Sequence, residues 1–352
     1  MKSRIQWMGI MAAMALVAGA LLARAEDNTT NIVNSGNEIN SSGEYTWGAN
    51  GCNNVLIITN GGMVSSVTGY IGKDASANNN TVIISGTGSL WSVGTGFDIG
   101  DRSSGNKVYI NNGARARSTA AYLGYYGGAN DNAVHVSGAG STFNVGEGLF
   151  IGNGGSGNSL TISDGGNVYS GEGATIGPGP KSLAIINGTS SVWTASGGIA
   201  VGGEPGSCLK MNGGTVSGSI LVKSGSTLTG SGTVGSVTLE KDAILDPVGK
   251  LTVNGALTLN AGTKLTFELG SPKTAGKYYS HVEVQGTLDL GGVEFGNFTF
   301  TTRDGFGPGT YQLFACSTIN GKLGAMAIGI VGGKKGKLSL VGENTIVLNV
   351  SR

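Results

Sequence analysis

The stretch ISGTGSLWSVGTGFDIG, residues 84–100, decides the fold because the chain repeats it. Related stretches follow as VSGAGSTFNVGEGLFIG (136–152) and INGTSSVWTASGGIAVG (186–202). Shorter versions alternate with these longer ones: ITNGGMVSSVTGYIG (58–72), INNGARARSTAAYLG (110–124) and ISDGGNVYSGEGATIG (162–177). One longer and one shorter version together make a unit of about 52 residues. A fixed period of this kind indicates one structural unit stacked on copies of itself.

The apolar residues that open these versions act as anchors of the repeat. The distance from one anchor to the next is about 26 residues, a period typical of solenoids. The anchors are Ile58, Ile84, Ile110, Val136, Ile162 and Ile186. Four residues before each of the first five stands an asparagine, at Asn54, Asn80, Asn106, Asn132 and Asn158. Identical positions of stacked coils lie about 4.8 Å apart, so we expect these asparagines to form a ladder of side-chain amides at a turn.

Each coil contains three short alternating segments, for example TVIIS (81–85), SLWSV (89–93) and GFDIG (96–100). Runs of four or five residues bounded by Gly, Asn and Ser are typical of strands rather than helices. A coil of about 26 residues with three strands is the rung of a parallel β-helix, in which each strand pairs with the equivalent strands of the neighbouring coils. The sequence therefore predicts an all-β solenoid.

The repeat also suggests how the chain is divided. We expect a signal peptide over 1–25, an N-terminal cap or lead-in over 26–51, and alternating coils over 52–212. The strand-like segments of 213–270 follow one another more closely, which predicts shorter coils of the same β-helix. The segment 271–352 has longer strands with hairpin-like turns, which predicts a β-rich C-terminal cap.

Residues 1–25 have the pattern of a secretory signal peptide. Lys2 and Arg4 precede an apolar run, and a small-x-small site ends at Ala25, so cleavage is expected before Glu26. The mature chain has no further apolar span, so we expect no integral membrane segment and an extracellular, cell-surface or outer-membrane-associated location.

Composition narrows the classes of partner. Of the 22 basic and 21 acidic residues, the signal segment holds three basic ones, which leaves 19 basic and 21 acidic residues. A net charge near −2 gives no reason to expect nucleic acid as a partner. The partners that remain are a surface glycan or another envelope protein, and the ends of the solenoid offer a place for self-association.

No constellation of catalytic or metal-binding residues stands out. The two histidines, His135 and His281, are each expected on an outer strand face, and no Cys or His cluster has zinc spacing. Cys52 and Cys208 are six coils apart, too far for a disulfide. We therefore expect no catalytic residues, no metal and no cofactor.

An aromatic track leaves two alternatives open. Seven residues after their anchors, the longer coils carry Trp91, Phe143 and Trp193, whereas the shorter coils carry Ser65, Arg117 and Tyr169. If Trp91, Phe143, Tyr169 and Trp193 point outward, they form a stripe suited to stacking on sugars. If they point inward, large and small layers alternate in the core, as close packing favours.

The stretches VSGAGSTFNVGEGLFIGNGGSGNSLTISDGGNVYSGEGATIG (136–177), GSGTVGSVTLEKDAILDPVGKLTVNGALTLNAGTKLTFELG (230–270) and GFGPGTYQLF (305–314) resemble known repeats. They are similar to the Gly-rich repeats of type V secretion passengers, of autotransporter-associated β-strand repeat proteins and of proteins with a Pro-Glu-Pro sorting signal. The resemblance implies a right-handed parallel β-helix of the pectin-lyase-like kind, exported and displayed or released at the cell surface.

Together these observations favour a secreted, non-catalytic β-helix with a structural or adhesive role. The alternative is a carbohydrate-binding or carbohydrate-cleaving β-helix that uses the aromatic stripe.

Overall fold

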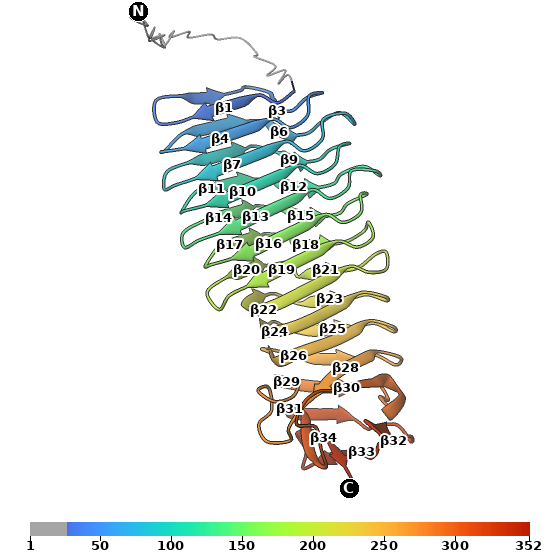
Figure 1. Ribbon diagram of the computed structural model, residues 1–352. Coiled ribbons are helices and arrows are strands. Elements are labelled where there is room, and N and C mark those ends of the chain that lie inside the picture. Colours follow the sequence, from blue (N-terminus) through green and yellow to red (C-terminus); the bar gives the residue numbers. More distant parts are fainter. Residues whose placement is uncertain (1–26) are drawn as a thin grey trace, which may run out of the picture.

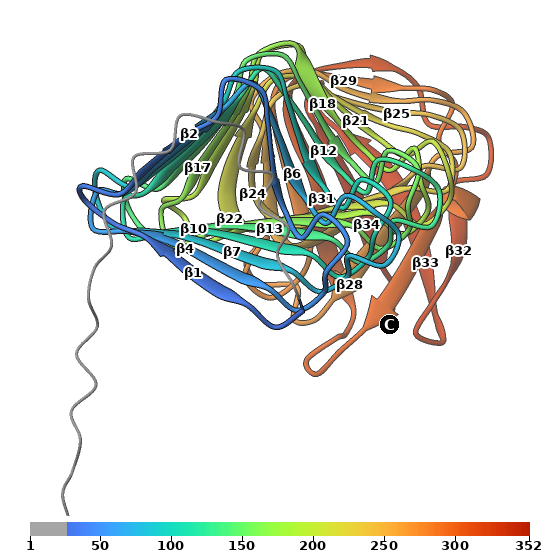
Figure 2. The same ribbon diagram turned by 90° about the horizontal axis from the view of Figure 1, so that it is seen from above.

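The computed structural model describes residues 27–352, so the predicted cleavage site between Ala25 and Glu26 lies outside the described residues. The chain winds into a single stack of coils with the C-terminus at one end (Figure 1). Seen along the stack, the coils have a roughly triangular outline with a strand on each side (Figure 2). Nearly all strand pairs are parallel and join equivalent strands of consecutive coils. The prediction of a parallel β-helix is confirmed.

We call the three sides the first, second and third sheets. In the first seven coils the first sheet contains β1 (Thr30–Val33), β4 (Val55–Thr59), β7 (Thr81–Ser85), β10 (Lys107–Asn111), β13 (Ala133–Ser137), β16 (Ser159–Ser163) and β19 (Leu183–Asn187). The second contains β2 (Glu38–Asn40), β5 (Met63–Ser66), β8 (Leu90–Val93), β11 (Arg115–Ser118), β14 (Thr142–Val145), β17 (Asn167–Ser170) and β20 (Val192–Ala195). The third contains β3 (Glu44–Trp47), β6 (Thr68–Ile71), β9 (Gly96–Ile99), β12 (Ala120–Leu123), β15 (Gly148–Ile151), β18 (Gly173–Ile176) and β21 (Ile199–Val201).

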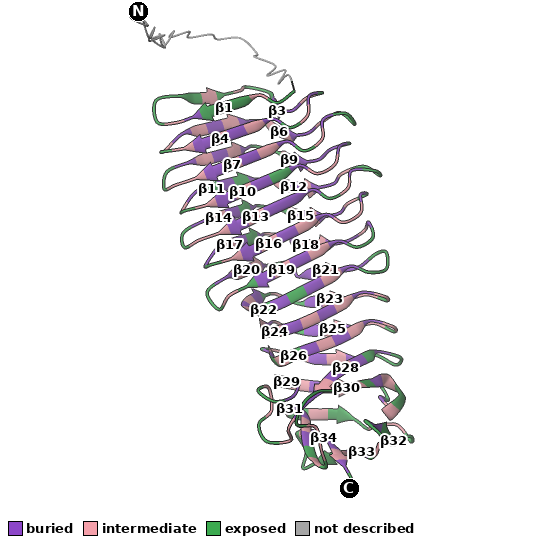
Figure 3. Cartoon of the chain, viewed as in Figure 1, coloured by how far each residue is buried: buried purple, intermediate pink, exposed green. Residues whose placement is uncertain are grey.

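The register follows the anchors. Ile58 pairs with Ile84, Ile84 with Ile110, and Ile110 with Val136. All six anchors are fully buried. Along these strands buried residues alternate with partly or fully exposed ones, and Figure 3 shows purple segments recurring in successive strands. One dry interior therefore runs the length of the stack.

The described chain already forms a coil before the first predicted one. Strands β1, β2 and β3 pair in parallel with β4, β5 and β6, and Val33 aligns with the anchor Ile58. Residues 30–47 are thus a full rung of the solenoid and not a separate lead-in. The sequence signal is weak here because Thr29 stands where later coils have the ladder asparagine; its hydroxyl donates to the Asn54 side chain.

From Cys208 the coils become shorter. Cys208 pairs with Thr227, Thr227 with Ile244, and Ile244 with Lys264. The turn between the first and second sheets becomes a bulge, so single long strands cover both sheets. These strands are β22 (Cys208–Ser217), β24 (Thr227–Val234) and β26 (Ile244–Val253), with β23 (Ile220–Val222), β25 (Val237–Leu239) and β27 (Leu257–Leu259) in the third sheet.

Parallel pairing continues past the predicted boundary at residue 271. Strand β28 (Lys264–Leu269) pairs in parallel with β30 (Phe298–Thr302), and β29 (His281–Leu290) pairs in parallel with β31 (Gly309–Gly321). A short 3-10 turn, η1 (Phe295–Asn297), precedes β30. Apart from one isolated antiparallel bridge between Leu269 and Tyr279, antiparallel pairing begins where β34 (Thr345–Val350) joins β31 and β33 (Lys334–Val341), with β32 (Ile328–Val331) on β33. The antiparallel cap is therefore shorter than predicted.

Between residues 27 and 352, no helix is long and apolar enough to cross a membrane. Cys52, Cys208 and Cys316 are all free thiols.

Candidate functional site

The asparagine ladder runs through the interior at the turn before the first sheet. The side-chain oxygens of Asn80, Asn106, Asn132 and Asn158 each accept two hydrogen bonds from the asparagine one coil earlier, one from its backbone N–H and one from its amide. For Asn80 and Asn106 these are 2.9 and 3.2 Å, and for Asn106 and Asn132 they are 2.9 and 3.0 Å. All five asparagines are fully buried. The ladder satisfies polar groups that would be costly to bury alone, so its role is structural.

The Gly that ends each third strand belongs to the same ladder. Gly48, Gly100 and Gly124 have positive φ angles, and a Cβ on any of them would overlap the ladder asparagine of the next coil. Ser182, Ser207 and Ser226 take the ladder place in later coils, where Gly152, Gly177 and Gly202 face them in the same way. The ladder asparagines and the glycines that end the third strands are therefore two sides of one contact.

The aromatic track is core and not a glycan stripe. Trp91, Phe143 and Trp193 are at most 1% exposed. They alternate in register with small residues in the second sheet, in the order Val64, Trp91, Ala116, Phe143, Val168, Trp193. The third sheet alternates in step, since Phe97 and Leu149 lie between Gly69, Ala121 and Ala174. Of the two alternatives, the inward one therefore holds for Trp91, Phe143 and Trp193, and the outward stripe does not.

Of the four aromatic residues of the track, only Tyr169 lies on the surface, with 39% exposure. It pairs with Asn144 and Thr194, whereas its neighbour Val168 pairs with Phe143 and Trp193. The longer coils have one extra residue in the turn before the second strand, since Thr81 and Leu90 lie one position farther apart in the chain than their partners Val55 and Met63. In a shorter coil, the residue seven positions after the anchor therefore points outward, whereas in a longer coil it points inward.

A group of partly exposed aromatic residues lies instead on the outer side of the third sheet. The outward positions in register are Thr46, Tyr70, Asp98, Tyr122, Phe150, Thr175, Ala200 and Leu221. The rings of Tyr122 and Phe150 stack at 5.0 Å with 5° between their planes. Tyr125 and Tyr126, in the following turn, extend this cluster edge-to-face.

The outward side chains that follow Phe150 along the third sheet are smaller, first Thr175 and then Ala200. Their small size leaves a hollow of about 450 Å³. We call it the aromatic hollow. A side chain at Gly148 would meet the Phe150 ring at 2.7 Å, so the ring lies against bare backbone on that side. The exposed Glu147 and Glu172 line the hollow, and neither belongs to an ion pair within residues 27–352. A flat ring beside hydrogen-bonding carboxylates is an arrangement that suits a sugar.

A second hollow, of about 480 Å³, lies on the outer side of the second sheet. Arg115, Arg117, Asn144, Asn167 and Tyr169 line it, and its lining contains no Asp or Glu. We call it the arginine hollow. The two hollows occupy neighbouring sides of the same coils and carry opposite charge.

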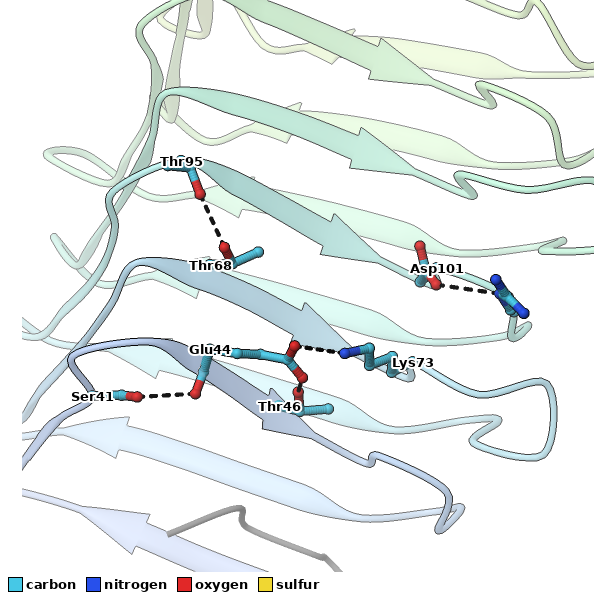
Figure 4. A network of polar contacts seen from close by, with 8 residues as sticks. Ser41, Glu44, Thr46, Thr68, Lys73, Thr95 and Asp101 are labelled. Atoms are coloured by element: carbon cyan, nitrogen blue, oxygen red, sulfur yellow. Dashed lines mark hydrogen bonds and ion pairs between the residues drawn. The ribbon is translucent and has the colours of Figure 1, made fainter. Parts of the chain in front are cut away.

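A polar network covers the outer third sheet towards the N-terminus (Figure 4). Lys73 forms an ion pair with Glu44 at 2.6 Å, and Glu44 accepts a hydrogen bond from Thr46. One coil further, Asp101 and Arg102 approach to 3.8 Å. Lys73 also lies 4.5 Å from the centre of the Tyr70 ring. Of these contacts, the ion pair between Lys73 and Glu44 joins two neighbouring coils.

Among the carboxyl groups of the described chain, Asp98 has the pKa that is raised furthest above its ordinary value. It lies between Tyr70 and Tyr122 with 7% exposure, and its Oδ1 has no hydrogen-bond partner among the described residues. Burial raises the pKa of Asp98 to about 7, the charge of Asp101 adds to the rise, and Lys73 opposes it. Burial also raises the pKa of Tyr70 to about 12. A carboxyl group in this setting is neutral in mildly acidic solution.

The two histidines differ from each other. His135 is half-buried on the outer side of the first sheet, where it stacks on Tyr109 at 4.9 Å. His281 is buried, contrary to the expected outward exposure, and its Nδ1 lies 3.0 Å from the Gln312 carbonyl oxygen. Burial lowers the pKa of both histidines. Within residues 27–352, no group of three or more His, Cys, Asp or Glu side chains is placed to hold a metal ion.

No protein-family model matches this chain, and no curated protein matches it. Among solved structures it is similar to the crystal structure of a TibC-catalysed hyper-glycosylated fragment of TibA. The identity is 15% and the TM-score 0.30, over 67% of this chain and 87% of that fragment. Function is therefore inferred from the chain's own geometry.

Proposed function

We propose that this chain is an exported, non-catalytic β-helix with a structural and adhesive role at the cell surface or outside the cell. The observation that carries the proposal is the unbroken ladder of coils. Twelve strands follow one another in the first sheet, and at about 4.8 Å per coil they span on the order of 50 Å. Stability of such a stack is summed over neighbouring coils, which suits a stiff spacer.

Export is supported by the n-region and apolar run of residues 1–25. To test it, the full chain with a C-terminal epitope tag is expressed in a Gram-negative host, and the N-terminus of the tagged product is sequenced. We expect a mature chain that begins at Glu26 in the extracytoplasmic fractions. A product that keeps residues 1–25 and stays in the cytoplasm would contradict export.

Adhesion is supported by charged side chains of the middle coils that line the two hollows and form no ion pair within residues 27–352. They are Arg115, Arg117, Glu147 and Glu172. Immobilised mature protein is expected to retain bacterial cells or envelope fragments. A variant that lacks the two coils 107–158 is a suitable comparison, because this deletion keeps the alternation of large and small core residues. Equal retention by both versions, or no retention by the native protein, would contradict adhesion through the middle coils.

The second candidate function is carbohydrate binding, and the aromatic hollow favours it. The ring of Phe150, which is not part of the possible stripe, lies beside Glu147 and Glu172 in an open hollow. Loss of one stacking ring weakens sugar binding, so we expect Phe150→Ala to reduce signals on a glycan array. Tyr70→Ala, which alters the same ladder outside the hollow, is the matched control. An array on which the native protein binds no neutral sugar would exclude this candidate.

A further inference from the structure

Two arginines stand side by side on the outer face of β11. Arg115 and Arg117 are two residues apart in the strand, so both point to the same side of the sheet. Both are exposed. Residues 27–352 contain five arginines, and two of them are here. This concentrates positive charge on one coil of a chain that is otherwise close to neutral.

Among the described residues, no carboxylate forms an ion pair with either arginine. The ion pairs of the described chain use Lys73, Arg102, Lys250, Lys264 and Arg303. The in-register neighbours of Arg115 are Leu90 and Thr142, and those of Arg117 are Ser92 and Asn144. Arg117 uses one donor on Ser92, whose hydroxyl oxygen accepts from Nε at 2.8 Å. That bond fixes the side chain and leaves the outer nitrogens of its guanidinium for a ligand.

The groups that follow the arginines along the stack are neutral and polar. Thr142 and Asn167 continue the column of Arg115, while Asn144 and Tyr169 continue the column of Arg117. The amides can donate and accept hydrogen bonds, and the exposed Tyr169 ring offers a flat apolar surface. These groups line the arginine hollow, whose lining extends over five consecutive strands of the second sheet, from Leu90 to Thr194.

We propose that the arginine hollow binds an acidic polysaccharide, with the carboxylate or sulfate groups of its sugars on Arg115 and Arg117. The planar guanidinium matches the two oxygens of a carboxylate or sulfate. Asn144 and Asn167 take the sugar hydroxyls, and Tyr169 packs against a sugar ring. The inference goes beyond the structural and adhesive role, because it assigns a site and a ligand class on a side of the coils separate from the aromatic hollow.

A nucleic acid is the competing polyanion. Its recognition depends on neutralising many phosphates along an extended basic surface, and only two cations lie in this hollow. Sugar hydroxyls, in contrast, make use of the amides and the tyrosine. The geometry therefore favours the polysaccharide, and a nucleic acid becomes one outcome of the test.

The test measures binding of purified mature protein to fluorescent oligosaccharides by anisotropy at low salt. Alginate fragments carry carboxylates, dextran sulfate carries sulfates, dextran is neutral, and single-stranded DNA serves as the phosphate polymer. We expect saturable binding of alginate or dextran sulfate that weakens with salt, and none of dextran. The double variant Arg115→Gln/Arg117→Gln is expected to weaken binding roughly tenfold or more, since two charge-assisted contacts are lost.

Two further variants distinguish binding at the arginine hollow from attraction to any exposed positive charge. Lys335→Gln/Lys337→Gln removes two exposed cations from β33 and is expected to bind as the native protein does. Tyr169→Ala keeps both arginines and is expected to weaken binding several-fold. Both arginine positions are exposed, so the variants are expected to fold, and circular dichroism checks this.

Three results would overturn the proposal. They are no binding of either acidic polysaccharide, equal weakening by the β33 variant and the β11 variant, or tighter arginine-dependent binding of DNA than of both polysaccharides. None of these measurements depends on export, so a cytoplasmic location would refute the proposed function while leaving this inference standing.

Discussion

The side-chain amide of Asn132 fills the space that a Cβ on Gly100 would need, one coil further along the stack. Gly100 also has a φ of 74°, in the left-handed region. Each of these conditions alone favours glycine, and together they require it. The contact recurs at Gly48 and Gly124, which explains why an apolar residue followed by Gly is so regular in this sequence.

The first prediction concerns this contact. Gly100→Ala is expected to destabilise the protein by about 2–4 kcal/mol, from the left-handed backbone and the displaced ladder. Gly128→Ala is the matched control, because Gly128 also has positive φ but a Cβ there has nothing within 4 Å. It is expected to cost only about 1 kcal/mol. Urea unfolding followed by circular dichroism compares the two, and equal losses would contradict the ladder explanation.

The second prediction removes one rung of the ladder. In Asn106→Ala the backbone N–H of Asn80 loses its acceptor, and the Asn80 amide keeps only its bond to the Ala77 carbonyl oxygen. We expect a loss of about 2–4 kcal/mol, since each unpaired buried donor costs about 1–3 kcal/mol. Asn187→Ala changes an exposed asparagine at the end of β19 and is expected to be close to neutral. A ladder variant as stable as this control would show that the hydrogen bonds contribute little.

The third prediction distinguishes core aromatics from surface ones. Trp91→Ala opens a cavity in the interior, and we expect it to lower the free energy of unfolding by about 3–5 kcal/mol. Tyr169→Ala removes an exposed ring and is expected to change stability by less than about 1 kcal/mol. Thermal melts of both variants test the difference. A Trp91 variant with native stability would mean that this side chain is outside the core.

The fourth prediction uses the pKa of Asp98. Because the folded-state pKa is about 7 against an ordinary value of 3.8, the folded protein holds a proton that the unfolded chain has released between these pH values. Stability from this group therefore falls as pH rises from about 4 to about 7, at up to about 1.4 kcal/mol per pH unit. Asp98→Asn removes the ionisation, so the variant is expected to be more stable than the native protein at pH 8 and similar to it at pH 4.

Denaturant unfolding between pH 4 and pH 8 tests this sign. Asp304→Asn, at an exposed position, serves as the control for loss of one negative charge. Native and Asp98→Asn curves that stay parallel over the whole range would show that Asp98 ionises alike in the folded and unfolded chain.

The sequence predicts the interior well because the interior repeats. Ile84 and Ile110 recur at a fixed spacing and pair in register, so the stacking of the coils follows from the sequence alone. Tyr169 shows the limit: one extra turn residue shifts the count, and only the pairing of Val168 with Phe143 reveals it. The first coil lacks the asparagine that marks the others, and the long strand β29 resembles a hairpin arm although it pairs in parallel.

The hollows could not be predicted from the anchors. They depend on outward positions, where residues do not repeat, and on the drop in size from Phe150 to Thr175 and Ala200. The regular apolar–Gly pairs that end the third strands align Tyr70, Asp98, Tyr122 and Phe150 from the sequence alone, since each stands directly before such a pair. What the sequence does not show is that Tyr122 and Phe150 line an open hollow.

The alternation of large and small core residues also limits which insertions and deletions of coils this chain can accept. Deleting the single coil that contains Ala116 would bring Trp91 against Phe143 on adjoining rungs, and both rings would compete for one layer. Deleting or duplicating two coils together keeps a small residue between them. Gene rearrangements in this repeat are therefore tolerated in steps of two coils, and descendants of this chain should differ by whole pairs.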